Sequence, residues 1–390
     1  MKSNRIVFFI LGWIGMLLYF TQRWIFGPLI PPLMEEFHTD RTALGIIGAA
    51  SLWGYMLTPI AAGVLSDRFG RKCAIIIGIF GFSLLTVVCG FSNGPRFLFF
   101  GRFLTGMVEA FYFIPMLAFT LELFPERPGF FLTTLSSGSS LGWFVGPALS
   151  GWLLDLTGSW RVPFFVAGLA GILVAIFLLT TWPDRDKTGT TIRYFDRAIL
   201  KRANLVMLVF LSLTGMFQIS AEFGFTMWYP AFLKTELGFA ATAAGLVAGL
   251  YGIGQCIGRP ILGWVSDRLG YRRVGIFCAF IMGITLMIIL ATNNPVLRAY
   301  CTFQAGFIGA AMMGAVWTFT GLVFPTFKGL ALGVITTFGY ATASLAPISI
   351  GYIGDHYSIS TGLWVIAVPA VFLGALSLLS TFLIRPTTKR

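Results

Sequence analysis

The chain has 390 residues, of which 57% are hydrophobic and 11% are charged. Soluble proteins carry roughly 25% charged residues, so this composition excludes an ordinary soluble enzyme. Disorder is excluded as well, because the chain contains 40 Phe, 11 Trp and 11 Tyr. A membrane helix needs about 20 apolar residues, so the length accommodates about a dozen helices and predicts an all-α membrane protein.

Twelve apolar segments follow one another along the chain, and a polar stretch separates the sixth from the seventh. Lys2 and Arg5 precede the first segment, which is too long for a secretory signal and is expected to be the first membrane helix. We predict two six-helix bundles, at 1–182 and 204–390, joined by a cytoplasmic linker at 183–203. The apolar segments run at 5–34, 43–66, 73–92, 95–122, 129–154, 162–182, 204–233, 240–265, 274–292, 295–323, 329–353 and 361–384.

Basic residues predict the orientation of these helices. Of the 27 Lys and Arg residues, 19 lie at the termini and in or beside loops on one side of the expected membrane, and three lie in the interior of the apolar segments. The other side has only five, which are Arg41, Arg96, Arg161, Lys234 and Arg298. Since cytoplasmic loops are rich in Lys and Arg, both termini are expected to be cytoplasmic. The net charge of +12 then reflects topology, and no nucleic-acid partner is expected.

Cysteine and histidine give no sign of a metal centre or cofactor. The five cysteines lie in apolar stretches or at their ends without paired spacing (Cys73, Cys89, Cys256, Cys278 and Cys301). The two histidines, His38 and His356, lie far apart in expected loops. We therefore expect small apolar packing residues at the cysteines and neither a metal nor a cofactor.

The two halves of the chain match at a constant shift of 200 residues. The shift stays the same from the end of the second segment to the end of the fifth segment, without an insertion or a deletion. It pairs Gly63, Ser66, Asp67, Arg68 and Gly70 with Gly263, Ser266, Asp267, Arg268 and Gly270; Pro95 and Gly106 with Pro295 and Gly306; Phe124 and Pro125 with Phe324 and Pro325; and Pro147, Gly151 and Asp155 with Pro347, Gly351 and Asp355. Parallel repeats of this kind in transporters place the substrate near the middle of the bilayer.

The loop after the second segment carries the most specific motif, Gly63-Val-Leu-Ser-Asp-Arg-Phe-Gly-Arg-Lys72, with a partial copy at 263–272. This motif resembles the signature loop of the major facilitator superfamily. The resemblance implies twelve helices in two pseudo-symmetric bundles, and a loop that gates the cytoplasmic face without binding substrate. The residues to which it assigns gating are Asp67, Arg68, Arg71, Asp267 and Arg268.

The fourth segment narrows the resemblance to one branch. Arg102-x3-Gly106-x2-Glu109-x5-Pro115, followed by Phe124-Pro-Glu-Arg127, is similar to the anion:cation symporter family, as are the tripeptides at 53–55 and 228–230. Members of this family often have an acidic residue before the arginine of the first helix, whereas this chain has Gln22. The resemblance implies a monomer in a prokaryotic inner or plasma membrane, surrounded by the lipid bilayer.

Five Arg and Glu residues lie in the interior of the apolar segments, away from the segment ends, where each costs about 3 kcal/mol or more. They are Arg23, Arg102, Glu109, Glu222 and Arg259. Three cations against two acids leave an excess of positive charge. Such a charge excess favours an anionic substrate, and a guanidinium suits a carboxylate because it can bind both oxygens.

Each of these residues has a functional and a structural interpretation. Arg23, with Tyr19 on the same helix face, is the expected carboxylate-binding residue, and a structural ion pair is the alternative. Glu109 is the expected proton carrier, and a permanent salt bridge is the alternative. Arg102 is either proton-linked or structural.

The second half contributes further candidates on its first two helices. Glu222 is a candidate for proton coupling, with an outer gate as the alternative. Gln255 and Arg259 share a helix face with Tyr251 at i+4 and i+8, and are expected either to contact the anion or to form an inner gate. The aromatic residues Tyr112 and Tyr340 are expected to line the substrate cavity.

The function that these observations predict is symport of a small organic anion, a carboxylate or sugar acid, with protons by alternating access. Sodium remains open as the coupling ion. Alternatives are an organophosphate/phosphate antiporter, another exporter of the superfamily, and a membrane sensor that transports nothing. An enzyme is not expected, because the apolar segments contain neither a histidine cluster nor a nucleophile–base pair. No nucleotide-binding loop of the G-x-x-x-x-G-K-S/T type is present, which argues against ATP-driven transport.

Overall fold

The computed structural model describes residues 2–59, 61–62, 65–66, 70–124, 128–181, 202–324 and 328–383. Within these ranges the backbone is almost entirely helical. The chain divides into two compact units: unit 1 comprises Met1–Thr191 with Tyr229–Gly249, and unit 2 comprises Ile192–Trp228 with Leu250–Arg390. The predicted linker lies outside the described residues except for its last two positions, where a helix has already begun, so the predicted bundle boundaries stay a prediction.

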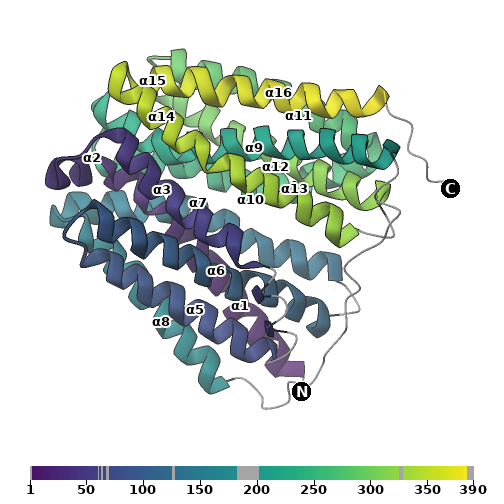
Figure 1. Cartoon of the computed structure of the whole chain (residues 1–390), viewed down its shortest axis with the longest axis horizontal. Coiled ribbons are helices and arrows are strands. Elements are labelled where there is room, and N and C mark those ends of the chain that lie inside the picture. Colours follow the sequence, from purple (N-terminus) through teal and green to yellow (C-terminus); the bar gives the residue numbers. More distant parts are fainter. Residues whose placement is uncertain are drawn as a thin grey trace. The chain divides into compact units, whose positions relative to one another are not determined.

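The first helix of unit 1, faint purple in Figure 1, contacts helices of the third, fourth, fifth and sixth predicted segments of the chain. The helices are α1 (Lys2–Trp24), α2 (Phe26–Phe37), α3 (Arg41–Leu57), α5 (Arg71–Gly90), α6 (Pro95–Leu123), α7 (Pro128–Thr157) and α8 (Arg161–Thr181). Because α1 packs against α5, α6, α7 and α8, polar side chains on its inner faces are shielded from lipid.

Unit 2 also consists of long helices, and its last membrane segment contains two short turns that are not α-helical. Its helices are α9 (Arg202–Thr235) and α10 (Ala241–Leu269), of which Tyr229–Gly249 belongs to unit 1, then α11 (Tyr271–Ala291), α12 (Pro295–Val323), α13 (Lys328–Ala343), α14 (Leu345–His356), α15 (Ile359–Gly362) and α16 (Val368–Ser380). A π-helical turn, Leu363–Ala367, joins α15 to α16, and a 3-10 turn follows at Thr381–Leu383.

Prolines divide two of the predicted membrane segments. The first segment is predicted as one helix, but α1 ends at Trp24 and α2 begins at Phe26. Pro28 has no N–H to donate to the carbonyl of Trp24, four residues earlier, so the helical ladder is interrupted there. Pro347 stands in the same relation to Ala343, where α13 ends. A proline therefore lies four residues after the end of each interrupted helix.

Glycines set the closest helix crossing in each unit. In unit 1, a Cβ on Gly54 would lie 2.0 Å from the carbonyl oxygen of Phe103, and a Cβ on Gly106 would lie 1.9 Å from that of Ser51. In unit 2, the corresponding distances are 2.1 Å for Gly254 and 1.9 Å for Gly306. Only glycine permits backbones to approach this closely. The shift of 200 residues therefore reproduces the crossing of α3 with α6 in the crossing of α10 with α12.

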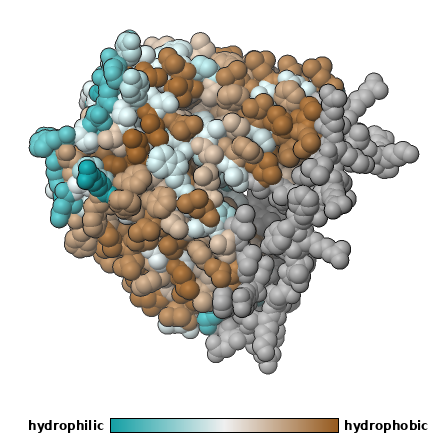
Figure 2. Space-filling view, viewed as in Figure 1, coloured by the Kyte–Doolittle hydropathy of each residue, from teal (hydrophilic) through white to brown (hydrophobic). Residues whose placement is uncertain are grey.

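The exposed surface is that of a membrane protein. Apolar residues cover most of the face that Figure 2 draws, and large side chains such as Phe177 and Phe277 are more than half exposed. Among the described residues, ten helical stretches are long and apolar enough to span a membrane. The other two predicted segments correspond to α3 and α7. The predicted all-α membrane architecture is confirmed.

Candidate functional site

A buried ion pair lies in the interior of unit 1. Arg23 is the penultimate residue of α1, and its Nη2 donates to Oε2 of Glu109 on α6. Only 4% of Arg23 and 1% of Glu109 is exposed. The break after Trp24 places the guanidinium at the carboxyl end of α1, where the helix dipole favours a cation. Removing one partner of such a pair leaves an uncompensated buried charge, so the two residues depend on each other.

Two aromatic rings flank the guanidinium of Arg23. The centroid of the Tyr19 ring lies 5.0 Å from Cζ, and that of Tyr55 on α3 lies 5.4 Å from it. Rings within about 6 Å attract a cation through their π-electrons. The predicted pairing of Tyr19 with Arg23 therefore corresponds to a direct contact.

The residue before Arg23 forms a closed hydrogen-bond network. The side-chain amide of Gln22 donates to Oγ of Ser83 at 3.2 Å and to the carbonyl oxygen of Ala167 at 3.0 Å. Its oxygen accepts a bond of 2.7 Å from the hydroxyl of Thr86. The carbonyl oxygen of Ala167 needs a donor, which an amide has and an ionised carboxylate lacks, so this site suits an amide. Gln22 thus fastens α1 to α5 and α8 beside the ion pair.

Arg102 is the second buried cation of unit 1. Its Nε donates to the carbonyl oxygen of Ile47 at 3.2 Å, and its Nη2 lies 3.5 Å from Oγ of Ser51. The ring of Phe26 lies 4.5 Å from its Cζ. Arg102 and Glu109 are both on α6, seven residues apart, and the two hydrogen bonds just described for Arg102 end on a carbonyl and a hydroxyl oxygen.

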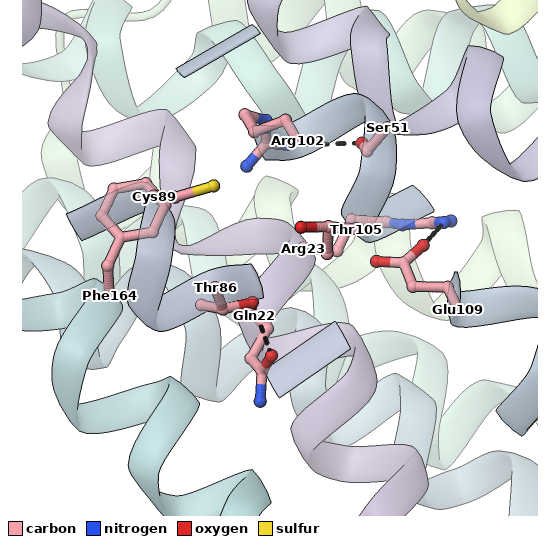
Figure 3. Close-up of a pocket in the computed structure, with 9 residues that line it drawn as sticks. All are labelled: Gln22, Arg23, Ser51, Thr86, Cys89, Arg102, Thr105, Glu109 and Phe164. Carbon is pink, nitrogen blue, oxygen red and sulfur yellow. Dashed lines mark hydrogen bonds and ion pairs between the residues drawn. The ribbon is translucent and has the colours of Figure 1, made fainter. Parts of the chain in front are cut away.

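A small cavity separates Arg102 from the ion pair (Figure 3). The space is the size of about one water molecule. Two guanidinium groups and one carboxylate surround it, which leaves one excess positive charge in a region of low dielectric, where it attracts anions strongly. The lining residues are Gln22, Arg23, Ser51, Thr86, Cys89, Arg102, Thr105, Glu109 and Phe164.

Unit 2 has its own polar cluster, around Glu222 on α9. The hydroxyl of Tyr251 donates to Oε1 of Glu222 at 3.1 Å, and the amide of Gln255 donates to the same oxygen. The amide oxygen of Gln255 in turn accepts a bond of 3.0 Å from Nη2 of Arg259. Tyr251, Gln255 and Arg259 therefore lie on one face of α10. A continuous chain of hydrogen bonds runs along it from the guanidinium of Arg259 to the carboxylate of Glu222.

The two predicted cavity tyrosines lie in different settings. The hydroxyl of Tyr112, fully buried, donates to the carbonyl oxygen of Gly12 at 2.7 Å and so links α6 to α1. Tyr340 on α13 is partly buried, with its ring 5.7 Å from that of Phe223. Roles of both residues in substrate binding stay predictions.

Part of the predicted gating loop is described. Asp67 and Arg68 lie outside the described residues. Arg71 is buried and donates from Nη1 to Oγ of Ser66 at 2.6 Å. In unit 2, Asp267 accepts a bond from the hydroxyl of Tyr271, and the Arg268 guanidinium lies 3.8 Å from the ring centroid of Trp264. Each gating assignment stays a prediction.

Two residues near the ion pair were not predicted to contribute to it. In the sequence, Gln22 stands out only as a departure from the family pattern, and Tyr55 only as part of the tripeptide at 53–55. The internal repeat contains a signal for both, because a shift of 200 pairs Gln22 with Glu222 and Tyr55 with Gln255. Both positions are therefore polar and close to an arginine in each unit.

Comparison with known proteins identifies the family of the chain. The family model of the Major Facilitator Superfamily matches residues 12–239 and 211–390. The cis,cis-muconate transport protein of Acinetobacter baylyi is 29% identical over 367 residues, covering 87% of each chain. The D-galactonate transporter of Escherichia coli is 27% identical over 385 residues, covering 88% of each chain.

Solved structures share the fold at lower sequence identity. A bacterial homologue of the human lysosomal transporter Spinster has a TM-score of 0.81 at 17% identity, and covers 98% of this chain and 97% of its own. A D-xylose–proton symporter has a TM-score of 0.75 at 16% identity, with coverage of 95% and 96%. The predicted fold class is confirmed. The chain belongs to the major facilitator superfamily, and it is a membrane transporter rather than an enzyme.

Proposed function

We propose that this transporter carries a small organic anion together with protons. The observation that supports the proposal most is the buried ion pair of Arg23 and Glu109. A guanidinium binds a carboxylate through two parallel hydrogen bonds, and Glu109 occupies that guanidinium while the substrate is absent. The substrate carboxylate and the Glu109 carboxylate thus compete for one partner.

Protonation of Glu109 resolves this competition. A neutral carboxylic acid no longer balances the charge of Arg23, so the guanidinium becomes available to an anion. Arg102 remains cationic on the other side of the cavity and adds to the attraction. Proton and anion therefore favour each other's binding, which is the thermodynamic requirement of symport.

The substrate class follows from the charge and from the relatives. Relatives include transporters of cis,cis-muconate, D-galactonate, gentisate and 4-hydroxybenzoate, all of which are organic acids by name. Carboxylates of aromatic, unsaturated or sugar type are therefore the proposed substrates. An organophosphate antiporter is less well supported, because α9 carries Glu222 where a second phosphate-binding arginine would be expected. We further propose that the transporter is a monomer. Both of its termini are proposed to lie in the cytoplasm, as the distribution of Lys and Arg predicts.

Uptake into proteoliposomes tests the proposal. We expect cis,cis-muconate, D-galactonate or 4-hydroxybenzoate to accumulate when the lumen is more alkaline than the outside, and a protonophore to abolish the accumulation. Arg23→Ala should bind none of these acids. Accumulation that follows a sodium gradient and ignores the pH gradient would overturn proton coupling. A protein that takes up none of the three acids would overturn the substrate class.

A further inference from the structure

Unit 2 contains a chain of hydrogen bonds to which the function proposed above assigns no role. It runs from Arg259 through Gln255 to Glu222, and all three side chains are buried or partly buried. In unit 1 the guanidinium and carboxylate meet directly. In unit 2 the amide of Gln255 is bonded to both the guanidinium and the carboxylate, so a neutral side chain that can rotate links the two charged groups.

The amide of Gln255 has two orientations with different consequences. In the structure its oxygen faces Arg259 and its NH2 group faces Oε1 of Glu222, an arrangement that stabilises the ionised carboxylate. Rotation by half a turn would present the amide oxygen to Glu222. That orientation is favourable only when Glu222 carries a proton that it can donate.

The contact with Arg259 holds Gln255 in the first orientation. A substrate anion that takes the Nη2 donor of Arg259 removes this restraint, and the amide then becomes free to accept from a protonated Glu222. We propose that Gln255 is a positioning residue that ties proton uptake by Glu222 to the binding of an anion at Arg259. The inference rests on the proposed function, and it adds a second coupled proton to the one at Glu109.

The surroundings of Glu222 are compatible with this role. The titratable or charged groups that face the cluster are Tyr251, Cys256 and Arg259 from α10 and Tyr340 from α13. Arg259 is the cation among them. Tyr251 donates to the oxygen that also accepts from Gln255, so it holds the carboxyl group in place during the exchange. Glu222 itself is 8% exposed, which gives water limited access to it.

Isothermal titration of the full-length protein in two buffers of different ionisation enthalpy tests the inference, because it counts the protons taken up per bound substrate. The probes are cis,cis-muconate, D-galactonate and 4-hydroxybenzoate. We expect Gln255→Met, which keeps the side-chain length, to reduce proton uptake by up to one proton relative to the wild type. Glu222→Gln should reduce it equally.

Two further variants separate the mechanism from a general effect on packing. Gln218→Met makes the same substitution on α9 at a buried glutamine outside the chain of bonds, and should keep wild-type proton uptake. The double variant Glu222→Gln with Gln255→Met should lose no more protons than either single variant, since both act on one event.

Three results would contradict the inference or the function on which it rests. Wild-type proton uptake in Gln255→Met or in Glu222→Gln, or additive losses in the double variant, would overturn the coupling role of Gln255. Failure of all three acids to bind the wild type would instead overturn the proposed function, and this inference with it. Binding with one proton taken up at Glu109 in every variant, wild type included, would leave the proposed function standing and refute the second proton.

Discussion

Gln22 and Glu222 occupy equivalent positions in the two halves, yet their surroundings demand opposite chemistry. Gln22 faces one carbonyl and two hydroxyl groups, and its amide matches all three. Within the described residues, Glu222 accepts from a tyrosine hydroxyl and an amide, and its carboxylate matches both. The buried carboxylate thus lies on α6 in unit 1 and on α9 in unit 2.

A charged residue should be poorly tolerated at position 22. In Gln22→Glu a carboxylate would face the carbonyl oxygen of Ala167 without a proton to donate, which costs about 1–3 kcal/mol or more for a charged group. Protonation restores the donor. The folded variant then binds more protons than the unfolded chain, so its stability should fall as pH rises.

Thermal unfolding between pH 5 and pH 8 measures this effect. The Tm of Gln22→Glu should approach that of the wild type at pH 5 and drop below it at pH 8. Gln22→Met lacks both hydrogen bonds and charge, so its loss of Tm should be the same at every pH. A Gln22→Glu variant that is as stable as the wild type at pH 8 would show that the amide network is not selective.

Proline and glycine place the helices that carry these residues. The break before Pro28 brings Arg23 to the end of α1, and in α14 the carbonyl oxygen of Pro347 accepts a bond of 2.8 Å from Nε1 of Trp228. Glycines at the helix crossings bring Ser51 and Tyr251 close to α6 and α12. The elements are therefore positioned by residues that make no contact with the ion pair.

The glycine crossing of unit 2 should not accept even one methyl group. Gly306→Ala would place Cβ 1.9 Å from the Tyr251 carbonyl oxygen, and the backbones must separate to relieve the clash. Overpacking of this kind costs about 1–3 kcal/mol. The control is Gly314→Ala on the same helix, where a Cβ meets nothing within 4 Å.

Thermal unfolding of the two alanine variants provides the comparison. We expect a lower Tm for Gly306→Ala and an unchanged or higher Tm for Gly314→Ala, because alanine favours the helix. Since Tyr251 also belongs to the Glu222 cluster, Gly306→Ala should reduce substrate affinity as well. Equal Tm values for both variants would contradict the close approach of α10 and α12.

At the scale of the molecule, the charges and the repeat made most of the architecture predictable. Rare ionisable residues in apolar segments identified Arg23 and Glu109 separately, because each must have a reason to be in the membrane. An ion pair was the alternative interpretation of each residue, but that the two residues pair with each other depends on how α1 packs against α6, which the sequence alone does not determine. The bonds from Gln22 to the carbonyl of Ala167 and from Tyr112 to that of Gly12 could not be predicted either, because every residue has a backbone carbonyl and the sequence does not indicate which one accepts.

The central claim is that Glu109 carries one of the coupled protons. Glu109→Gln mimics the protonated state permanently, so Arg23 should still bind and exchange substrate. One proton moving down a gradient of one pH unit contributes about 1.4 kcal/mol, which corresponds to a tenfold accumulation.

The decisive measurement is the limiting accumulation ratio of labelled cis,cis-muconate in proteoliposomes with a gradient of one pH unit and the membrane potential held at zero. Glu35→Gln, at an exposed glutamate of α2, serves as the matched control and should behave like the wild type. We predict that Glu109→Gln retains exchange of labelled for unlabelled substrate, while its accumulation ratio falls by about tenfold. Accumulation equal to that of the wild type, or loss of exchange together with accumulation in a folded protein, would contradict the account.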